Sequence, residues 1–211
     1  MMLDALPPTT VARLELASFS RGGSVILRNI HLDLLRGQTL ALVGPSGIGK
    51  TTLLRILAGL EDGYSGRVSV EGRVAVVFQE PALLPWRSLR DNICLPTGAT
   101  RDAAEAMLAE VGLAGRSGDF PGQLSLGQQR RVALARAFAA APDLLLLDEP
   151  FVSLDAALVQ DMMDLFLKLR DRHRVATLFV THAEAEARYL SDRIIRLQGS
   201  PASLAPLSAI T

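Results

Sequence analysis

Short apolar runs alternate with amphipathic stretches along the chain, and the two patterns predict different elements. Alternating polar and apolar residues at 12–16 and 29–34 predict two half-buried strands. Continuous apolar runs at 39–43 and within 143–150 (DLLLLDEP) predict strands that are buried on both faces. Further strand signals occur at 67–70, 73–78, 176–181 and 193–197.

Helical spacing of apolar residues separates these strands. It predicts helices over 50–60, 101–113, 126–141 and 155–170. Buried strands that alternate with helices favour an α/β fold with helices on the faces of the sheet. The region 81–141 carries no strand signal, so we expect a mainly helical lobe there.

The length of 211 residues suits one domain with such a lobe. We place this single domain at 11–198, with a catalytic core formed by about 11–80 and 142–198 and the helical lobe at about 81–141. The segments 1–10 and 199–211 are expected to be loose ends.

Composition excludes several classes of protein. The chain has 22 basic and 22 acidic residues, so its formal charge of zero gives no footprint for nucleic acid. No apolar stretch reaches the roughly 18 residues that a membrane span needs. The single cysteine, Cys94, excludes an internal disulfide and a cysteine-cluster metal site, which indicates an intracellular protein.

A glycine-rich loop follows the buried strand at 39–43. The segment GPSGIGKT at 44–51 matches G-x-x-x-x-G-K-[ST] and lies between a strand and a helix. Its glycines allow a backbone nest of inward N–H groups, its lysine reaches the β- and γ-phosphates, and its threonine hydroxyl binds Mg²⁺. The sequence therefore predicts a nucleoside triphosphate site. The residues of this site are Gly44, Pro45, Ser46, Gly47, Ile48, Gly49, Lys50, Thr51 and Thr52.

Two acidic residues follow the second buried strand. Asp148 suits a ligand of Mg²⁺ or its water, and Glu149 is placed to orient or deprotonate the attacking water. Without a phosphate loop, such a pair is more often the start of a helix. Together with the loop at 44–51 it indicates hydrolysis.

The segment LSLGQQRR at 124–131 begins a helix in an unusual way. Ser125 and Gln128 form a capping-box pattern, Gly127 lies in the first turn, and two arginines follow where acidic residues suit the helix dipole better. A helix start with these features suits an anion, and no acidic residue of the segment supplies one.

The order of these motifs resembles that of the ATP-binding subunits of ABC transporters over about 11–198. GPSGIGKT matches the nucleotide loop, Gln79 the Q-loop glutamine, and LLLLDEP the Walker B strand. Leu124–Gln128 corresponds to the signature, with Leu126 where glycine is usual. Ser153, Leu154 and Asp155 correspond to the D-loop, and His182 to the switch histidine.

The resemblance implies a P-loop fold with a mainly parallel sheet, an N-terminal antiparallel β subdomain and a helical lobe. It implies ATP as ligand, Mg²⁺ held by Thr51, Gln79 and Asp148, and catalysis by Glu149, His182 and Gln79. It also implies a head-to-tail dimer, with itself or a sister subunit. In this dimer the signature residues act on the nucleotide of the other chain, and the missing anion is its γ-phosphate. These signature residues are Ser125, Leu126, Gly127 and Gln128.

The family further implies membrane permease subunits, an external solute-binding protein and a peripheral place on the cytoplasmic face of the cell membrane. A contact with the permease is expected from Leu83, Leu84, Trp86 and Arg87, although Trp86 could equally belong to the core of the lobe. Phe19 is the candidate for stacking on adenine, with plain core packing as the alternative. His31 and His173 are interpreted as solvated surface.

The loop FQEPALLPW is similar to that of importers for nitrate, sulfonates, taurine and thiamine precursors. An importer ATPase is therefore the leading hypothesis. The alternatives are a P-loop phosphotransferase, a cytosolic ABC ATPase that acts on nucleic acid, and a subunit that binds ATP without hydrolysing it.

Overall fold

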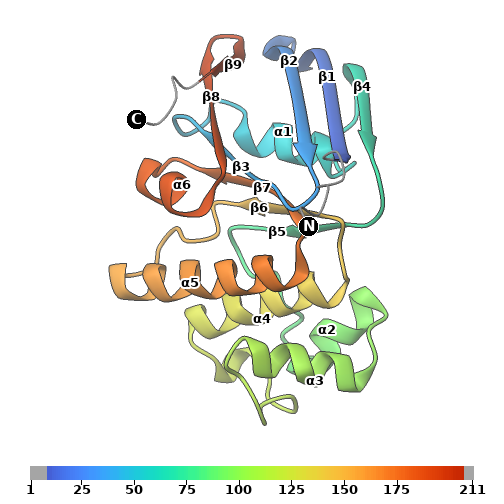
Figure 1. Ribbon diagram of the computed structural model, residues 1–211, viewed down its shortest axis with the longest axis vertical. Coiled ribbons are helices and arrows are strands. Elements are labelled where there is room, and N and C mark those ends of the chain that lie inside the picture. Colours follow the sequence, from blue (N-terminus) through green and yellow to red (C-terminus); the bar gives the residue numbers. More distant parts are fainter. Residues whose placement is uncertain (1–8, 207–211) are drawn as a thin grey trace, which may run out of the picture.

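A nine-stranded sheet runs through the protein, and the computed structural model describes residues 9–206 of it (Figure 1). The strands are β1 (Thr10–Arg21), β2 (Ser24–Leu35), β3 (Thr39–Val43), β4 (Tyr64–Val70), β5 (Val74–Val77), β6 (Leu144–Asp148), β7 (Ala176–Thr181), β8 (Arg193–Gly199) and β9 (Ala202–Pro206). The helices are α1 (Lys50–Leu57), α2 (Leu89–Thr97), α3 (Arg101–Glu110), α4 (Leu126–Ala139), α5 (Ala156–His173) and α6 (Glu184–Leu190), with a 3₁₀ turn at Pro121–Gln123.

The sheet has a parallel and an antiparallel part, in the strand order β4-β1-β2-β9-β8-β3-β7-β6-β5. Strands β8, β3, β7, β6 and β5 pair in parallel. Strand β1 pairs antiparallel with both β2 and β4. The predicted α/β fold, with a mainly parallel core and an antiparallel N-terminal part, is confirmed.

The central strands are buried on both faces, as their continuous apolar runs predict. In β3, Ala41 and Val43 pack into the core shared with the helical lobe, whereas Leu40 and Leu42 face the core around α1. All five residues of β3 and of β6 are buried. Polar side chains can therefore reach solvent only at the ends of these strands.

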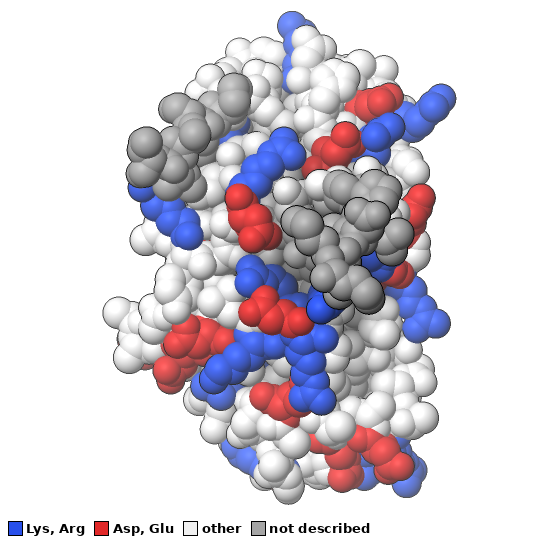
Figure 2. All heavy atoms as spheres, in the orientation of Figure 1, with Lys and Arg blue, Asp and Glu red and all other residues white. Residues whose placement is uncertain are grey.

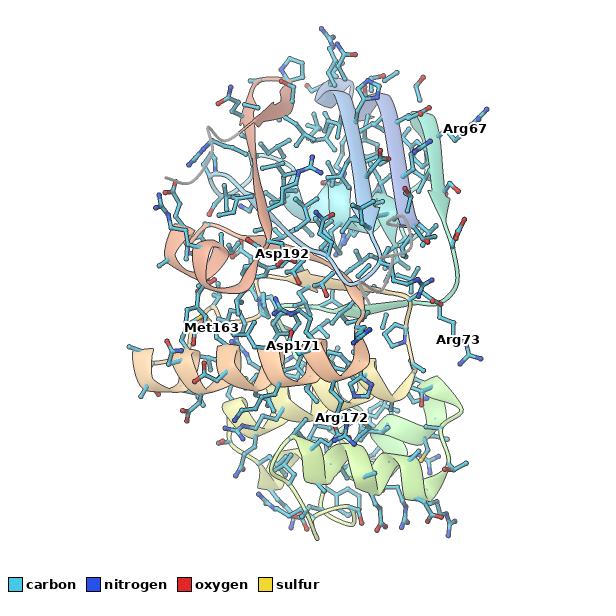
Figure 3. All side chains as sticks on the ribbon, viewed as in Figure 1. Arg67, Arg73, Met163, Asp171, Arg172 and Asp192 are labelled. Carbon is cyan, nitrogen blue, oxygen red and sulfur yellow. The ribbon has the colours of Figure 1, made fainter. Side chains whose placement is uncertain are left out.

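Helices α2, α3 and α4 form the lobe below the sheet, and α4 contacts both β5 and α5 (Figure 1). Arg172 near the end of α5 reaches Glu110 of α3, with 3.2 Å between Nη1 and Oε1 (Figure 3). Charged side chains of both signs are intermixed on the face shown in Figure 2. Among the described helices, none has the length and apolarity that crossing a bilayer would take.

The predicted loose end at 199–211 is corrected for its first part. The chain turns back after Gly199 (φ 89°), and residues Ala202–Pro206 then form β9, which pairs antiparallel with β8. This strand also pairs with β2 through Leu27 and Ala202, so it joins the two parts of the sheet. The sequence SPASLAPL shows no clear alternation of polar and apolar residues, so it does not predict a strand. A short strand between two neighbours needs little side-chain patterning.

Two helices, α2 and α6, carry no separate prediction, and the first predicted helix ends earlier than expected. Helix α1 stops at Leu57, which leaves Leu60 58% exposed. Met162, Leu165 and Leu169 on α5 are buried, whereas Leu158 on the same helical stripe is half-buried. The residues 1–8 and 207–211 of the predicted loose ends lie outside the described part of the chain.

Candidate nucleotide site

Four parallel strands place their carboxyl ends at the same edge of the sheet. Gly44 follows β3, Asp148 ends β6, His182 follows β7, and Gln79 comes two residues after β5. Ligands of open α/β sheets bind at this edge, because the loops there converge around a crevice. The topology thus brings together residues that are up to about 140 positions apart.

The loop 44–51 has the backbone of an anion nest. Gly47 and Gly49 take φ values of 77° and 111°, which side chains rarely allow. A Cβ on Gly44 would lie 2.8 Å from the Leu197 carbonyl oxygen, so glycine is required there by close packing as well. Helix α1 follows without an acidic residue in its first turn and without a side-chain cap, which leaves its N–H groups free for an anion.

The ammonium group of Lys50 is buried beneath this loop, with the residue 4% exposed. Its Nζ donates to the carbonyl oxygens of Gly44 at 2.9 Å and Pro45 at 3.0 Å. The same atom lies 3.5 Å from Oε1 of Glu149. An ammonium group has three protons, and all three directions are thus taken up by oxygen atoms.

Thr51 and Asp148 face each other across the crevice. The Thr51 hydroxyl donates to Oδ1 of Asp148 at 2.9 Å. Burial raises the pKa of Asp148, against the opposing effect of this hydrogen bond. A hydroxyl and a buried carboxylate at one point are oxygen ligands of the kind that Mg²⁺ prefers, so the residues fit the metal that the fold implies.

Glu149 lies between Lys50 and His182. Its second oxygen, Oε2, is 3.2 Å from Nδ1 of His182, whose side chain is 51% exposed. The backbone of Glu149 is left-handed, with φ 46°, which costs about 1 kcal/mol or more for a residue with a side chain. A strained backbone that aims a carboxylate into a crevice is typical of a catalytic position.

A cavity of about 540 Å³ runs from the loop 44–51 toward the hairpin of β1 and β2. Gln79 and Glu149 lie on its wall. Its lining comprises Arg21, Ile26, Ser46, Gly47, Gly49, Lys50, Thr51, Thr52, Gln79 and Glu149.

Phe19 does not line this cavity, which contradicts the prediction that it stacks on adenine. It is 3% exposed and belongs to the core around α1. The buried phase of β1 shifts by one residue between Leu16 and Phe19, where the pairing with β4 is irregular, so the odd-numbered Phe19 turns inward.

Arg21 takes the place at the cavity wall that the sequence assigns to Phe19. Its Nη2 is 2.6 Å from Oε2 of Glu61, and its Cζ lies 5.6 Å from the centre of the Phe19 ring. The guanidinium therefore lies within cation–π range of the Phe19 ring. Its position just before the Gly22–Gly23 turn is the signal in the sequence that could have identified it.

The predicted signature begins α4 in the expected capping box. The Ser125 hydroxyl accepts from the Gln128 N–H at 3.3 Å, and Oε1 of Gln128 accepts from the Ser125 N–H at 3.1 Å. The hydroxyl proton of Ser125 is still available to an anion, because the cap uses the oxygen only as an acceptor. Leu126 takes the helical backbone of a first-turn residue and is 43% exposed.

Gly127 has a packing role in this chain. A Cβ on it would lie 2.7 Å from Cδ2 of Leu158 on α5. The D-loop residues Ser153, Leu154 and Asp155 precede α5, and the Asp155 carboxylate caps it by accepting from the Leu158 N–H at 2.9 Å. Ser153 lines a second cavity, of about 650 Å³, together with Gln79, Leu83 and Leu126.

Trp86 is 69% exposed, so it is not a core residue of the lobe. Arg87 is also exposed, whereas Leu83 and Leu84 are half-buried. The loop that carries them is held by Asn92, which is 0% exposed. Its Oδ1 accepts from the Leu84 N–H at 2.6 Å, and its amide group donates to the carbonyl oxygens of Leu84, Arg87 and Ser88 at 3.0–3.1 Å. No feature of the sequence singles out this asparagine.

The nest at 44–51, the buried lysine, the pair of Thr51 and Asp148 and the carboxylate of Glu149 define the site of a P-loop nucleoside triphosphatase. Comparison with known proteins gives the family. A family model described as "ABC transporter" matches residues 27–152, and the chain belongs to this family.

Curated relatives and a solved structure agree with this assignment. The chain is 45% identical over 199 residues to "Aliphatic sulfonates import ATP-binding protein SsuB 2" of Burkholderia cenocepacia, covering 89% of this chain and 74% of that protein. It is 50% identical over 179 residues to the protein of the same name from Frankia alni, covering 84% and 73%. The dimeric ATP-binding cassette MJ0796, bound to ADP and Pi, is 28% identical and superposes with a TM-score of 0.79, covering 94% and 100%.

The hydrogen bonds of Asn92 predict how strongly the loop of Trp86 depends on it. In the Asn92→Asp variant a carboxylate would face three buried carbonyl oxygens, and we expect a loss of about 3 kcal/mol or more in the free energy of unfolding. At about 2–4 °C per kcal/mol, Tm should fall by about 6 °C or more. Thermal unfolding followed by the emission of Trp86, the only tryptophan, measures this change.

The matched control is Asn29→Asp, because Asn29 is exposed and its left-handed backbone (φ 50°) is one that aspartate also tolerates. Equal Tm values for the two variants would contradict the role assigned to Asn92.

Proposed function

We propose that this chain is the ATP-hydrolysing subunit of an importer for a small solute and works as a head-to-tail dimer. The observation that carries the proposal is the position of Glu149. Its carboxylate lies between the ammonium group of Lys50 and the ring of His182, at the strand edge where the phosphate loop opens. The carboxylate, as a general base, and the two side chains that could contact a γ-phosphate, Lys50 and His182, thus converge on one point.

Triphosphate binding is assigned to the loop 44–51. The N–H groups of the nest and of the first turn of α1 face the phosphates, and Lys50 exchanges its carbonyl partners for phosphate oxygens. Thr51 and Asp148 would hold Mg²⁺ together with Gln79, and the ion would neutralise charge on the β- and γ-phosphates. Pro45, Ser46, Ile48 and Thr52 complete the walls of the loop.

Hydrolysis is assigned to Glu149. Its carboxylate orients a water molecule and takes up its proton as the bond from water oxygen to γ-phosphorus forms and the bond to ADP breaks. His182 holds Glu149 at 3.2 Å and is exposed enough to contact the γ-phosphate. Gln79, exposed at the end of the β5 segment, is the group that senses the same phosphate from the side of the lobe.

The start of α4 is assigned to the nucleotide of a second subunit. Ser125 offers a hydroxyl proton, while Leu126 and Gly127 offer N–H groups of the first helical turn. Leu126 needs no positive φ here, so leucine fits the helix in place of the usual glycine. Ser153, Leu154 and Asp155 are expected to face the same dimer contact. The dimeric form of MJ0796 supports this arrangement, with this chain or a sister subunit as the partner.

Contact with a permease is assigned to the surface of Leu83, Leu84, Trp86 and Arg87. A tryptophan that is 69% exposed next to an arginine is typical of an interface anchor. This contact would hold the chain at the cytoplasmic face of the membrane, with an external solute-binding protein in the same system. The names of the curated relatives support an organic sulfonate as the solute.

The Glu149→Gln variant tests hydrolysis. We expect kcat to fall about 100-fold or more, because the amide cannot accept the proton of water, while the affinity for ATP is kept. The variant should also form a stable dimer with Mg-ATP, measured by size-exclusion chromatography. Glu184→Gln is the control, since Glu184 is an exposed, ion-paired glutamate two residues after His182. Unchanged turnover in Glu149→Gln would remove Glu149 from its role.

The Arg21→Ala variant tests whether Arg21 contacts the adenine base of ATP. If the adenine ring lies against the Arg21 guanidinium, ATP should bind about 10-fold more weakly to this variant, whereas inorganic tripolyphosphate should bind as before. Arg21→Tyr should restore the affinity for ATP, because a ring also offers a stacking face. Arg13→Ala is the control: Arg13 lies on the same strand and pairs with Asp33 at 2.9 Å, away from the cavity. An equal loss for tripolyphosphate would place Arg21 at the phosphates instead.

Co-expression with the membrane proteins encoded by neighbouring genes tests the transport role. We expect the chain to purify in detergent as a complex with its permease, and Trp86→Ala to weaken that complex at least about 10-fold. The ATPase activity of the isolated subunit should stay unchanged in Trp86→Ala. If the chain stays apart from every such membrane protein, the transport role is wrong.

A further inference from the structure

Two arginines of α4 each hold main-chain oxygens of a loop that follows a strand of the parallel sheet. Arg130 donates from Nη1 to the Pro150 carbonyl oxygen at 2.9 Å and from Nη2 to that of Val152. Arg136 donates from Nη1 to the Ala82 carbonyl oxygen at 2.8 Å and from Nη2 to that of Pro81 at 2.9 Å. Each guanidinium thus bridges two carbonyl groups of one loop.

Both loops directly follow a side chain of the nucleotide site. The turn held by Arg130 comes after Glu149, and the loop held by Arg136 comes after Gln79. Each contains residues other than glycine with a left-handed backbone. These are Glu149 (φ 46°) and Ser153 (φ 64°) in the first loop and Ala82 (φ 45°) in the second.

The fork of a guanidinium suits this task. Its N–H groups have a fixed geometry and a full charge, so one arginine can fix two carbonyl oxygens at once. Arg130 is 6% exposed, and among the described atoms its Nε has no hydrogen-bond partner, so its hydration has been exchanged for the two carbonyl groups. Such a buried cation holds the loop tightly, because moving the carbonyl groups away would leave it unpaired.

Helix α4 is also fixed at its beginning. Gly127 packs against Leu158 of α5 so closely that a Cβ would lie 2.7 Å from that side chain. The start of α4, the turn after Glu149 and the loop after Gln79 are therefore connected through one helix.

We propose that Arg130 and Arg136 are positioning residues for ATP hydrolysis: each holds a strained loop so that Glu149 or Gln79 faces the γ-phosphate. This inference rests on the proposed function of the same site. It adds a route between the two sites of a dimer. The start of α4 contacts the nucleotide of the partner. The two arginines then couple the position of α4 to the loops after Glu149 and Gln79 in their own chain.

Strain in the loop gives a specific test of Arg136. In Arg136→Lys one ammonium group replaces the fork, and we expect kcat to fall about 10-fold with little change in KM for Mg-ATP. Adding Ala82→Gly should bring kcat back to within about 3-fold of the unmodified protein, because glycine adopts φ 45° without strain. Ala140→Gly is the matched control: it makes the same chemical change at φ −71° and should not restore kcat.

Arg131, the next residue on the same helix, is the control for Arg130. Arg131 donates from Nη1 to the Val111 carbonyl oxygen at 3.2 Å, which lies within the lobe. We expect Arg130→Lys to lower kcat about 10-fold and Arg131→Lys to leave it within about 2-fold. Equal losses in the two variants would overturn the proposal for Arg130. If Arg130→Lys does not fold, the rescue experiment at Arg136 decides.

Hydrogen exchange separates a failure of this inference from a failure of the proposed function. Amides of 79–84 should exchange about 10-fold faster in Arg136→Lys, and those of 149–154 in Arg130→Lys, whether or not ATP is hydrolysed. An unmodified protein without ATPase activity would contradict the function alone. Unchanged exchange in both loops, or no rescue by Ala82→Gly, would overturn the role of the two arginines.

Discussion

Burial of the parallel strands on both faces is the constraint on which the rest of the structure depends. Every side chain of β3, β6 and β7 is in the interior, so chemistry can occur only where these strands end. Because the strands are parallel, their carboxyl ends lie at one edge. The phosphate loop, the carboxylates of Asp148 and Glu149, and the ring of His182 meet there as a consequence of topology, although they are far apart in the sequence.

The same constraint explains which parts of the site could be predicted. Gly44, Asp148 and Glu149 end or follow the continuous apolar runs that predict buried strands, and Lys50 belongs to the glycine-rich motif after the first run. The antiparallel part is different. There a strand has only one buried face, and a shift of one residue reverses which side chains point inward. The misplacement of Phe19 comes from such a shift in β1.

Residues that act on main-chain atoms of distant loops could not be predicted at all. Asn92 binds the backbone of Leu84, Arg87 and Ser88, and Arg130 binds that of Pro150 and Val152. Neither partner leaves a trace in the sequence, because any residue supplies a carbonyl group. For the same reason β9 was missed: its place between β8 and β2 depends on backbone pairing more than on its own side chains.

In this arrangement the charged groups of the site pair with one another. Lys50 faces two carbonyl oxygens and Glu149, the Thr51 hydroxyl faces Asp148, and Glu149 also faces His182. A buried ammonium group without these partners would be costly, so the fold supplies them from its own backbone. A triphosphate with a divalent cation offers replacements of the same kind: phosphate oxygens for Lys50 and a cation for Asp148. Under the proposed function, binding would exchange one set of pairs for another and would free Glu149 from Lys50. Under the same proposal, the carboxylate would become available as a base when a phosphate takes its place beside the lysine, which would tie the chemical step to the presence of the substrate.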